Sequence, residues 1–172
     1  LSEDGSQPMN IDGYVITYNG EIYNYLEIKE ELIKLGEVFK TSSDTEVLLR
    51  SYIRWGEKCL NKFNGMWAFA IFDPIKNQIF CSRDRFGIKP FYYLSNSKHF
   101  IFGSEIKQLL PFIKVRKLNR KIAADYLVYG FEEHTSSTFF KNIYSLPAGS
   151  YLIYNLNSND FEIDQYYNYS PS

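Results

Sequence analysis

In the first third of the chain, apolar residues recur at the spacing of an amphipathic helix. This pattern predicts helices over residues 24–35, 43–55 and 58–63. The first two begin with a capping box, in which an Asn or Ser side chain and a Glu three residues later bind each other's backbone N–H groups. The two predicted capping boxes pair Asn24 with Glu27 and Ser43 with Glu46.

After residue 65 the pattern changes to short apolar runs separated by turn residues. Residues 66–72, MWAFAIF, form a nearly continuous apolar run, which predicts a strand covered on both faces. Further helices are predicted over 104–110 and 119–129. The other predicted strands span residues 13–18, which end at an Asn19-Gly20 turn, and 38–41, 78–82, 90–94, 99–103 and 150–155. Helices that come early and strands that follow in antiparallel hairpins indicate the α+β class.

The last segment differs in composition from the rest of the chain. Residues 157–172 are rich in Asn, Ser, Asp and Tyr, and they end in YYNYSPS. Such a composition favours a linker over a packed core. We therefore expect one domain over residues 1–156, followed by a linker.

Charge and cysteine usage exclude several classes of function. The chain has 19 basic and 20 acidic residues, so it lacks the basic excess that nucleic-acid binding requires. Cys59 and Cys81 lie far apart, and His99 and His134 are isolated, which argues against a disulfide framework and a metal site. No apolar run is long enough to span a membrane. A reducing, cytoplasmic location is expected.

Two polar segments are candidates for chemistry. Asn19 and Gly20 are predicted to lie between a strand and a helix, where a side-chain amide and a backbone N–H can stabilise an oxyanion. The alternative is a simple turn. Asp44 falls in the first turn of a predicted helix, where it either complements the helix dipole by about 0.5 kcal/mol or receives a substrate ammonium.

The remaining candidates favour structural roles. Residues 82–90, SRDRFGIKP, either bind an anion or form a paired surface corner, and the second is the simpler interpretation. Cys59 lies among apolar residues and is expected to pack in the core. Cys81 lies near Arg83, which lowers the pKa of a neighbouring thiol, but no histidine is near in sequence to serve as its base.

Five blocks taken together are more specific than any one of them. They are YNGEIYNY (18–25), SSDTEVLL (42–49), YIRWGEKCLNKFNGMWAFAIFD (52–73), SRDRFGIKPFYY (82–93) and FGSEIKQLL (102–110). In this order the chain resembles the glutaminase domain of glutamine-hydrolysing asparagine synthetases, a class II amidotransferase with an N-terminal nucleophile. The resemblance runs from LSEDGSQPM to SLPAGSYL and implies a four-layer α/β/β/α sandwich, N-terminally truncated.

The resemblance also implies a mechanism and a set of site residues. In the family, the thiolate of an N-terminal cysteine attacks the amide of glutamine, and the free α-amino group of that cysteine is the base. Asn19 and Gly20 would stabilise the oxyanion, Glu21 would help to hold glutamine, and Asp44 would receive its α-ammonium. This domain would need no cofactor. The ammonia would pass to a C-terminal synthetase domain that activates aspartate with Mg-ATP.

The chain departs from the family pattern at its beginning. Leu1 matches an interior point, so the cysteine, the opening strand and an arginine for the substrate carboxylate are expected upstream. We therefore expect these 172 residues to be inactive alone, and to form dimers or aggregates through unpaired strands. Two alternatives stay open: a degenerate domain with a binding or scaffold role, and an amidotransferase that acts on another acceptor.

Overall fold

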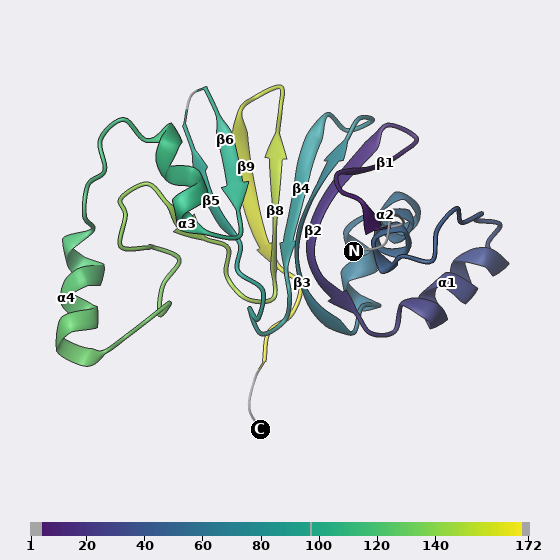
Figure 1. Ribbon diagram of the computed structural model, residues 1–172, viewed down its shortest axis with the longest axis horizontal. Helices are drawn as coiled ribbons and strands as arrows, with labels where there is room; N and C mark the ends of the chain where they lie inside the picture. Colours follow the sequence, from purple (N-terminus) through teal and green to yellow (C-terminus); the bar gives the residue numbers. More distant parts are fainter. Residues whose placement is uncertain (1–4, 97, 170–172) are drawn as a thin grey trace.

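The computed structural model describes residues 5–96 and 98–169, which form two antiparallel β-sheets with helices outside them (Figure 1). The larger sheet has the order β1-β2-β3-β4-β8-β9, and the smaller has the order β6-β5-β7. The strands of the larger sheet are β1 (Met9–Ile11), β2 (Tyr14–Ile22), β3 (Gly65–Asp73), β4 (Gln78–Arg83), β8 (Ser150–Asn155) and β9 (Asp160–Gln165). Those of the smaller sheet are β5 (Tyr92–Ser95), β6 (Phe100–Gly103) and β7 (Tyr144–Ser145).

The helices lie at the two ends of the sandwich. The α-helices are α1 (Tyr25–Lys34), α2 (Asp44–Trp55), α3 (Ile106–Leu109) and α4 (Arg120–Tyr129). Two 3₁₀ helices, η2 (Gly56–Asn61) and η3 (Leu110–Phe112), follow α2 and α3. Helices α1 and α2 lie on the outer face of the larger sheet, and α3 lies beside the smaller one (Figure 1).

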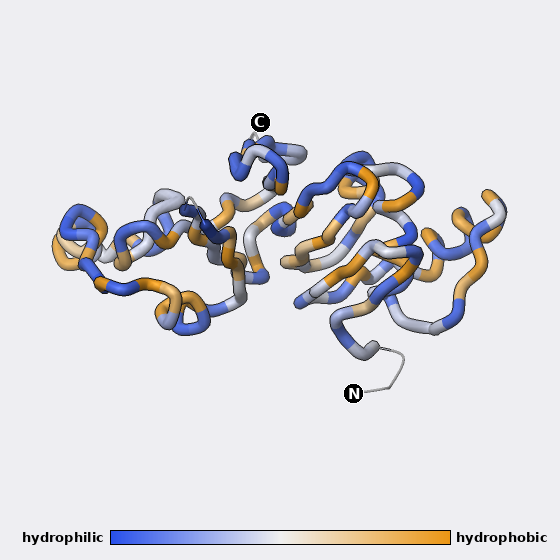
Figure 2. The backbone as a smooth tube through the Cα atoms, turned by 90° about the horizontal axis from the view of Figure 1, so that it is seen from above, coloured by the Kyte–Doolittle hydropathy of each residue, from blue (hydrophilic) through white to orange (hydrophobic). Residues whose placement is uncertain are grey.

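Strand β3 shows how one apolar run supplies two cores. Trp67, Phe69 and Ile71 point toward α1 and α2, whereas Ala68 and Ala70 point toward the smaller sheet. This alternation follows from the two-residue period of a strand. Figure 2 colours the backbone by hydropathy and shows hydrophobic segments in both halves of the molecule. A third apolar cluster lies between the smaller sheet and α3. Three cores between four layers give the predicted α/β/β/α sandwich.

The predicted turn at Asn19-Gly20 is wrong. Strand β2 continues through both residues, and they pair with Ala68 and Trp67 of β3. Glycine is required here because a Cβ at Gly20 would lie 2.8 Å from the Cα of Trp67. The Asn-Gly pair therefore permits a close approach of two strands, and the tertiary pairing overrides the local turn signal.

The predicted strand over residues 38–41 is also wrong. These residues form an irregular loop, because their backbone groups bond to a side chain instead of a neighbouring strand. The N–H groups of Lys40 and Thr41 donate to the Glu46 carboxylate, at 3.0 and 2.6 Å. Glu46 therefore does not close the predicted capping box, although Ser43 Oγ accepts from Thr45 N at 3.2 Å.

The other predicted capping box, at Asn24, is not formed. The Asn24 side chain makes no capping hydrogen bond to α1. It donates instead to the carbonyl oxygen of Lys62 at 2.9 Å and accepts from the N–H of Asn64 at 2.8 Å. Asn24 therefore ties the start of α1 to the chain that leads into β3.

Strand β9 lies within the segment for which a linker is expected. It pairs with β8 along its whole length. The polar residues Asp160, Glu162 and Asp164 alternate with Phe161 and Ile163, and this alternation suits the exposed edge of a sheet. The division of the chain into a domain over 1–156 and a linker stays a prediction.

Helix α4 is largely exposed. Ile122 is its buried residue, whereas Leu127 is 81% exposed. Despite this exposed apolar surface, no helix within the described ranges is long and apolar enough to cross a membrane.

Candidate active site

The predicted site residues meet where β2 passes the start of α2. Asn19, Gly20 and Glu21 are consecutive residues of β2, and Asp44 is the first residue of α2. The Asp44 carboxylate is tied to the strand, because its Oδ2 accepts hydrogen bonds from the Tyr18 hydroxyl at 2.9 Å and from Ile22 N at 3.1 Å. These two bonds fix the first turn of α2 against β2.

Tyr18 lines two cavities. The first, of about 410 Å³, is lined by Gly20, Glu21 and Asp44 together with loop residues 42 and 43. The second, of about 350 Å³, is lined by Asn19 and by residues of β3 and β6. Tyr18 and Gln7 line both cavities, which therefore adjoin. The structure thus gathers three of the four predicted residues around one cavity and places Asn19 in its neighbour.

The backbone N–H of Gly20 points toward the open edge of β2. Alternate N–H groups of a strand point to the same edge. Tyr18 N donates to Gln7 Oε1 at 2.6 Å and Ile22 N donates to Asp44, both beyond that edge. The N–H of Gly20 lies between these two and has the same orientation, away from β3. The side-chain amide of Asn19 donates to Ser104 Oγ at 3.3 Å on the other side of the strand.

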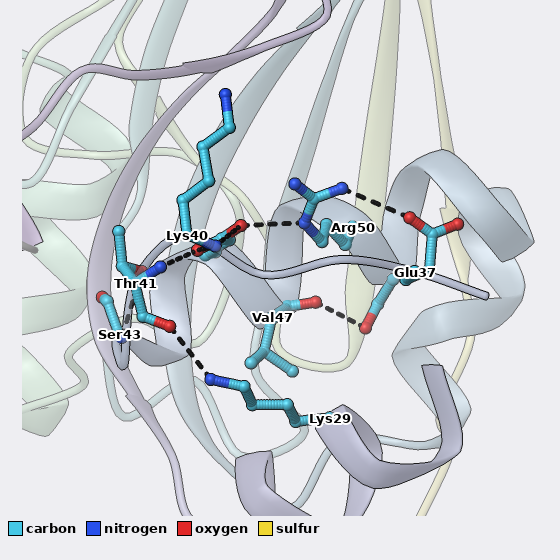
Figure 3. A network of polar contacts seen from close by, with 9 residues as sticks. Lys29, Glu37, Lys40, Thr41, Ser43, Val47 and Arg50 are labelled. Carbon is cyan, nitrogen blue, oxygen red and sulfur yellow. Dashed lines mark hydrogen bonds and ion pairs between the residues drawn. The ribbon is translucent and has the colours of Figure 1, made fainter. Parts of the chain in front are cut away.

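A buried ionic network supports the loop that leads to Asp44 (Figure 3). Arg50 donates to Glu46 at 2.8 Å and to Glu37 at 3.2 Å, and Lys29 donates to the carbonyl oxygen of Thr41 at 2.9 Å. Burial alone would raise the pKa of Glu46, but the hydrogen bonds from Lys40, Arg50 and Thr41 outweigh it and lower that pKa. Glu46 is therefore held as a carboxylate that anchors two successive backbone amides.

In the charged segment 82–90, Arg83 and Asp84 have structural roles, but they are buried and do not form the expected paired surface corner. All five N–H donors of Arg83 are used. They bond to the carbonyl oxygens of Lys89, Leu146 and Gly87, to Ser145 Oγ and to Glu133. The carboxylate of Asp84 accepts from the N–H groups of Trp67, Phe86, Ile88 and Lys89. No side-chain N–H of Arg83 is therefore left to bind an anion.

Neither cysteine has the properties of a nucleophile. Cys59 and Cys81 are both fully buried, in the outer core and in the core between the sheets. Burial raises the pKa of both thiols, so the nucleophilic thiolate is suppressed. For Cys81, burial outweighs the effect expected from its neighbour Arg83.

Sequence reasoning missed two residues at this site. Tyr18 bonds to Asp44, and Gln7 bonds to the backbone of Tyr18. The period-two alternation of a strand contains a signal for Tyr18, because Tyr18, Gly20 and Ile22 occupy one face of β2. No comparable local pattern points to Gln7, whose approach depends on the tertiary fold.

The fold is that of known amidotransferases. The glutamine phosphoribosylpyrophosphate amidotransferase of Bacillus subtilis superposes with a TM-score of 0.64, over 96% of this chain and 33% of that one. A second structure, of the allosteric regulatory enzyme of purine biosynthesis, gives 0.63 over 95% and 32%. At 20% sequence identity in both cases, these likenesses establish the fold alone.

Sequence comparison identifies the family. The profile of the family described as "Glutamine amidotransferase domain" matches residues 1–167, and the chain belongs to this family. A Methanocaldococcus jannaschii protein, provisionally named asparagine synthetase [glutamine-hydrolyzing] 2, is 43% identical over 97% of this chain and 35% of its own length. Asparagine synthetase [glutamine-hydrolyzing] 3 of Bacillus subtilis is 49% identical over 66% of this chain and 20% of its own. The chain therefore spans about a third or less of these relatives.

Proposed function

We propose that this domain binds glutamine and stabilises the oxyanion formed during its hydrolysis to glutamate and ammonia. The supporting observation is the arrangement around β2, where Gly20 and Asp44 line one cavity and Asn19 lines the adjoining one. A carboxylate suits the α-ammonium of glutamine, and the Asn19 amide with the Gly20 N–H suits a tetrahedral oxyanion. Glu21 lines the same cavity as Asp44 and would contribute to holding the substrate.

The attacking thiol would come from outside these 172 residues. Cys59 and Cys81 are the two cysteines of the sequence, and both are fully buried. An upstream cysteine would have to reach the space beside Asn19 and Gly20. We therefore expect the 172-residue polypeptide to release no glutamate from glutamine when tested alone.

The ammonia would be used by a synthetase domain of the same polypeptide. The relatives named as glutamine-hydrolysing asparagine synthetases support aspartate as the acceptor, activated by Mg-ATP in that further domain. The substrate of this domain would be glutamine, its partner would be the synthetase domain, and its location would be the cytoplasm.

The test separates ammonia production from ammonia use in the full-length gene product. Asn19→Ala removes one oxyanion donor and is expected to lower kcat for glutamate release by about 10²–10³-fold. Asparagine formation from free ammonia, aspartate and Mg-ATP is expected to stay unchanged. Asn61→Ala, at an exposed asparagine at the end of η2, is the matched control and should retain both activities.

Two results would contradict the proposal. If Asn19→Ala releases glutamate at the wild-type rate, the oxyanion assignment is wrong. If the wild-type protein binds glutamine in calorimetry without turnover, the domain has the binding role that was the alternative interpretation. Ammonia-dependent amidation of an acceptor other than aspartate would preserve the glutaminase and replace the synthetase assignment.

A further inference from the structure

The two oxygens of the Asp44 carboxylate have different surroundings. Oδ2 accepts both bonds from β2, one from the Tyr18 hydroxyl and one from Ile22 N. No hydrogen bond to Oδ1 is found among residues 5–96 and 98–169, and Asp44 lines the 410 Å³ cavity. Within this described part of the chain, the fold engages one oxygen and leaves the other available to a ligand.

The side chain of Tyr18 reaches Asp44 by crossing Gly20. Residues at every second position share a strand face, so Tyr18, Gly20 and Ile22 lie in a row. A Cβ added to Gly20 would lie 2.8 Å from Cε2 of the Tyr18 ring. The absence of a side chain at Gly20 therefore creates the space in which the ring lies and from which its hydroxyl meets Asp44.

The hydroxyl of Tyr18 is a stable donor. Its burial, and then the negative charge of Asp44, raise the pKa of Tyr18. The phenol therefore keeps its proton throughout the physiological range and donates it to the carboxylate. A hydrogen bond to a charged acceptor is short and directional, which suits it to fix the rotation of a carboxylate.

We propose that Tyr18 is a positioning residue, which holds Asp44 by Oδ2 so that Oδ1 receives the α-ammonium of glutamine. This proposal rests on the proposed function, because it takes glutamine as the ligand of Asp44. This role makes Tyr18 a determinant of substrate binding and not a catalytic residue. Ile22 N supplies the second bond to Oδ2, so removal of the Tyr18 hydroxyl should loosen the carboxylate without releasing it.

Tyr18→Phe tests this proposal in the full-length gene product, since it removes the hydroxyl and retains the ring. Loss of one hydrogen bond to a charged group predicts a rise in KM for glutamine of about tenfold or more. The kcat for glutamate release should stay within about twofold, because Asn19 and Gly20 are untouched. Tyr23→Phe, in an exposed tyrosine of the same segment, is the matched control and should leave both constants unchanged.

Coupling to Asp44 distinguishes positioning from a general structural effect. Asp44→Asn is expected to raise KM more than Tyr18→Phe does, because it removes the charge that pairs with the ammonium. In the double variant, Tyr18→Phe should add less than about twofold to that KM, because the carboxylate it orients is gone. Additive effects would overturn the proposal, as would an unchanged KM in Tyr18→Phe.

The same measurements keep this inference separate from the proposed function. A wild-type protein that releases no glutamate from glutamine contradicts the proposed function and, with it, this inference. A wild-type protein with glutaminase activity and a Tyr18→Phe variant with a lower kcat at unchanged KM would retain the glutaminase and contradict the positioning role. Ammonia-dependent synthesis checks that each variant remains folded.

Discussion

Two polar segments of this chain, residues 82–90 and residues 18–22, differ in how their polar groups are bonded. In residues 82–90, Arg83 and Asp84 are buried. The side-chain N–H groups of Arg83 and the carboxylate oxygens of Asp84 all form hydrogen bonds within the protein. In residues 18–22, the N–H of Gly20 is directed to an open edge, and this segment holds Asp44 of α2 through one carboxylate oxygen. Polar groups whose hydrogen bonds are all made inside the fold stabilise it. Groups that are fixed in place but keep an unbonded donor or acceptor are available to a ligand.

The largest expected effect on stability comes from Arg83→Lys. Lysine retains the charge but cannot make five hydrogen bonds in the planar arrangement of a guanidinium. Three carbonyl oxygens, one of them buried, lose their donors, so the free energy of unfolding should fall by about 3 kcal/mol. Native-state hydrogen exchange of the amides of β4 and residues 84–89 measures this change.

Arg85→Lys is the matched control for that measurement. Arg85 lies over the ring of Tyr167 at 5.4 Å and is not part of the buried set around Arg83. Its replacement should lower the stability by less than about 1 kcal/mol. Equal effects of the two substitutions would remove the contrast between the buried Arg83 and its half-buried neighbour Arg85.

An effect on stability of intermediate size, which depends on pH, is expected at Glu46. This residue stabilises the fold and supports the loop that leads to Asp44. Its pKa in the folded protein lies below the ordinary value of 4.5, so its stabilising contribution is complete above pH 4.5. This contribution is lost as the pH falls through the folded pKa, when the carboxylate takes up a proton. Protection of the Lys40 and Thr41 amides in hydrogen exchange should fall over that range.

Glu46→Gln checks the assignment of this titration. The amide keeps one acceptor oxygen but loses the charge that pairs with Arg50, so protection at Lys40 and Thr41 should be lower. It should also no longer change below pH 4.5 beyond the intrinsic exchange rates. A titration that persists in the variant would show that another group controls the loop.

The smallest expected effect on stability is that of Asn19→Ala. The Asn19 amide makes one exposed hydrogen bond, to Ser104, so its loss should change the stability of β2 by less than about 0.5 kcal/mol. The same variant is expected to lose most glutaminase activity. A destabilisation as large as that of Arg83→Lys would place Asn19 with the structural residues and contradict the comparison.

The sequence predicted the elements whose signals are local and strong. The apolar run of β3, the hairpin of β5 and β6 and the helix α2 are confirmed. The turn predicted at Asn19-Gly20 was wrong, because the sequence alone does not distinguish a glycine that allows a neighbouring strand to approach from one that turns the chain. Residues 38–41 misled because the side chain of Glu46, and not another strand, binds their amides.

The residues of the candidate site could be predicted from the sequence, but their spatial arrangement could not. Local patterns singled out Asn19, Gly20 and Asp44, and resemblance to a family added Glu21 and favoured their roles in the site, which stay predictions. The contact between Tyr18 and Asp44 joins residues 26 positions apart, so it depends on how α2 packs against β2. Local patterns contain no information on that packing angle.

The complete burial of Cys59 and Cys81 has a practical consequence for chemical labelling. A thiol-alkylating reagent applied to the native protein should leave both side chains unmodified. An additional reactive thiol in the native protein can therefore be counted by mass spectrometry, because the two buried cysteines add no label. Any label taken up under native conditions would report on a cysteine that the fold leaves exposed.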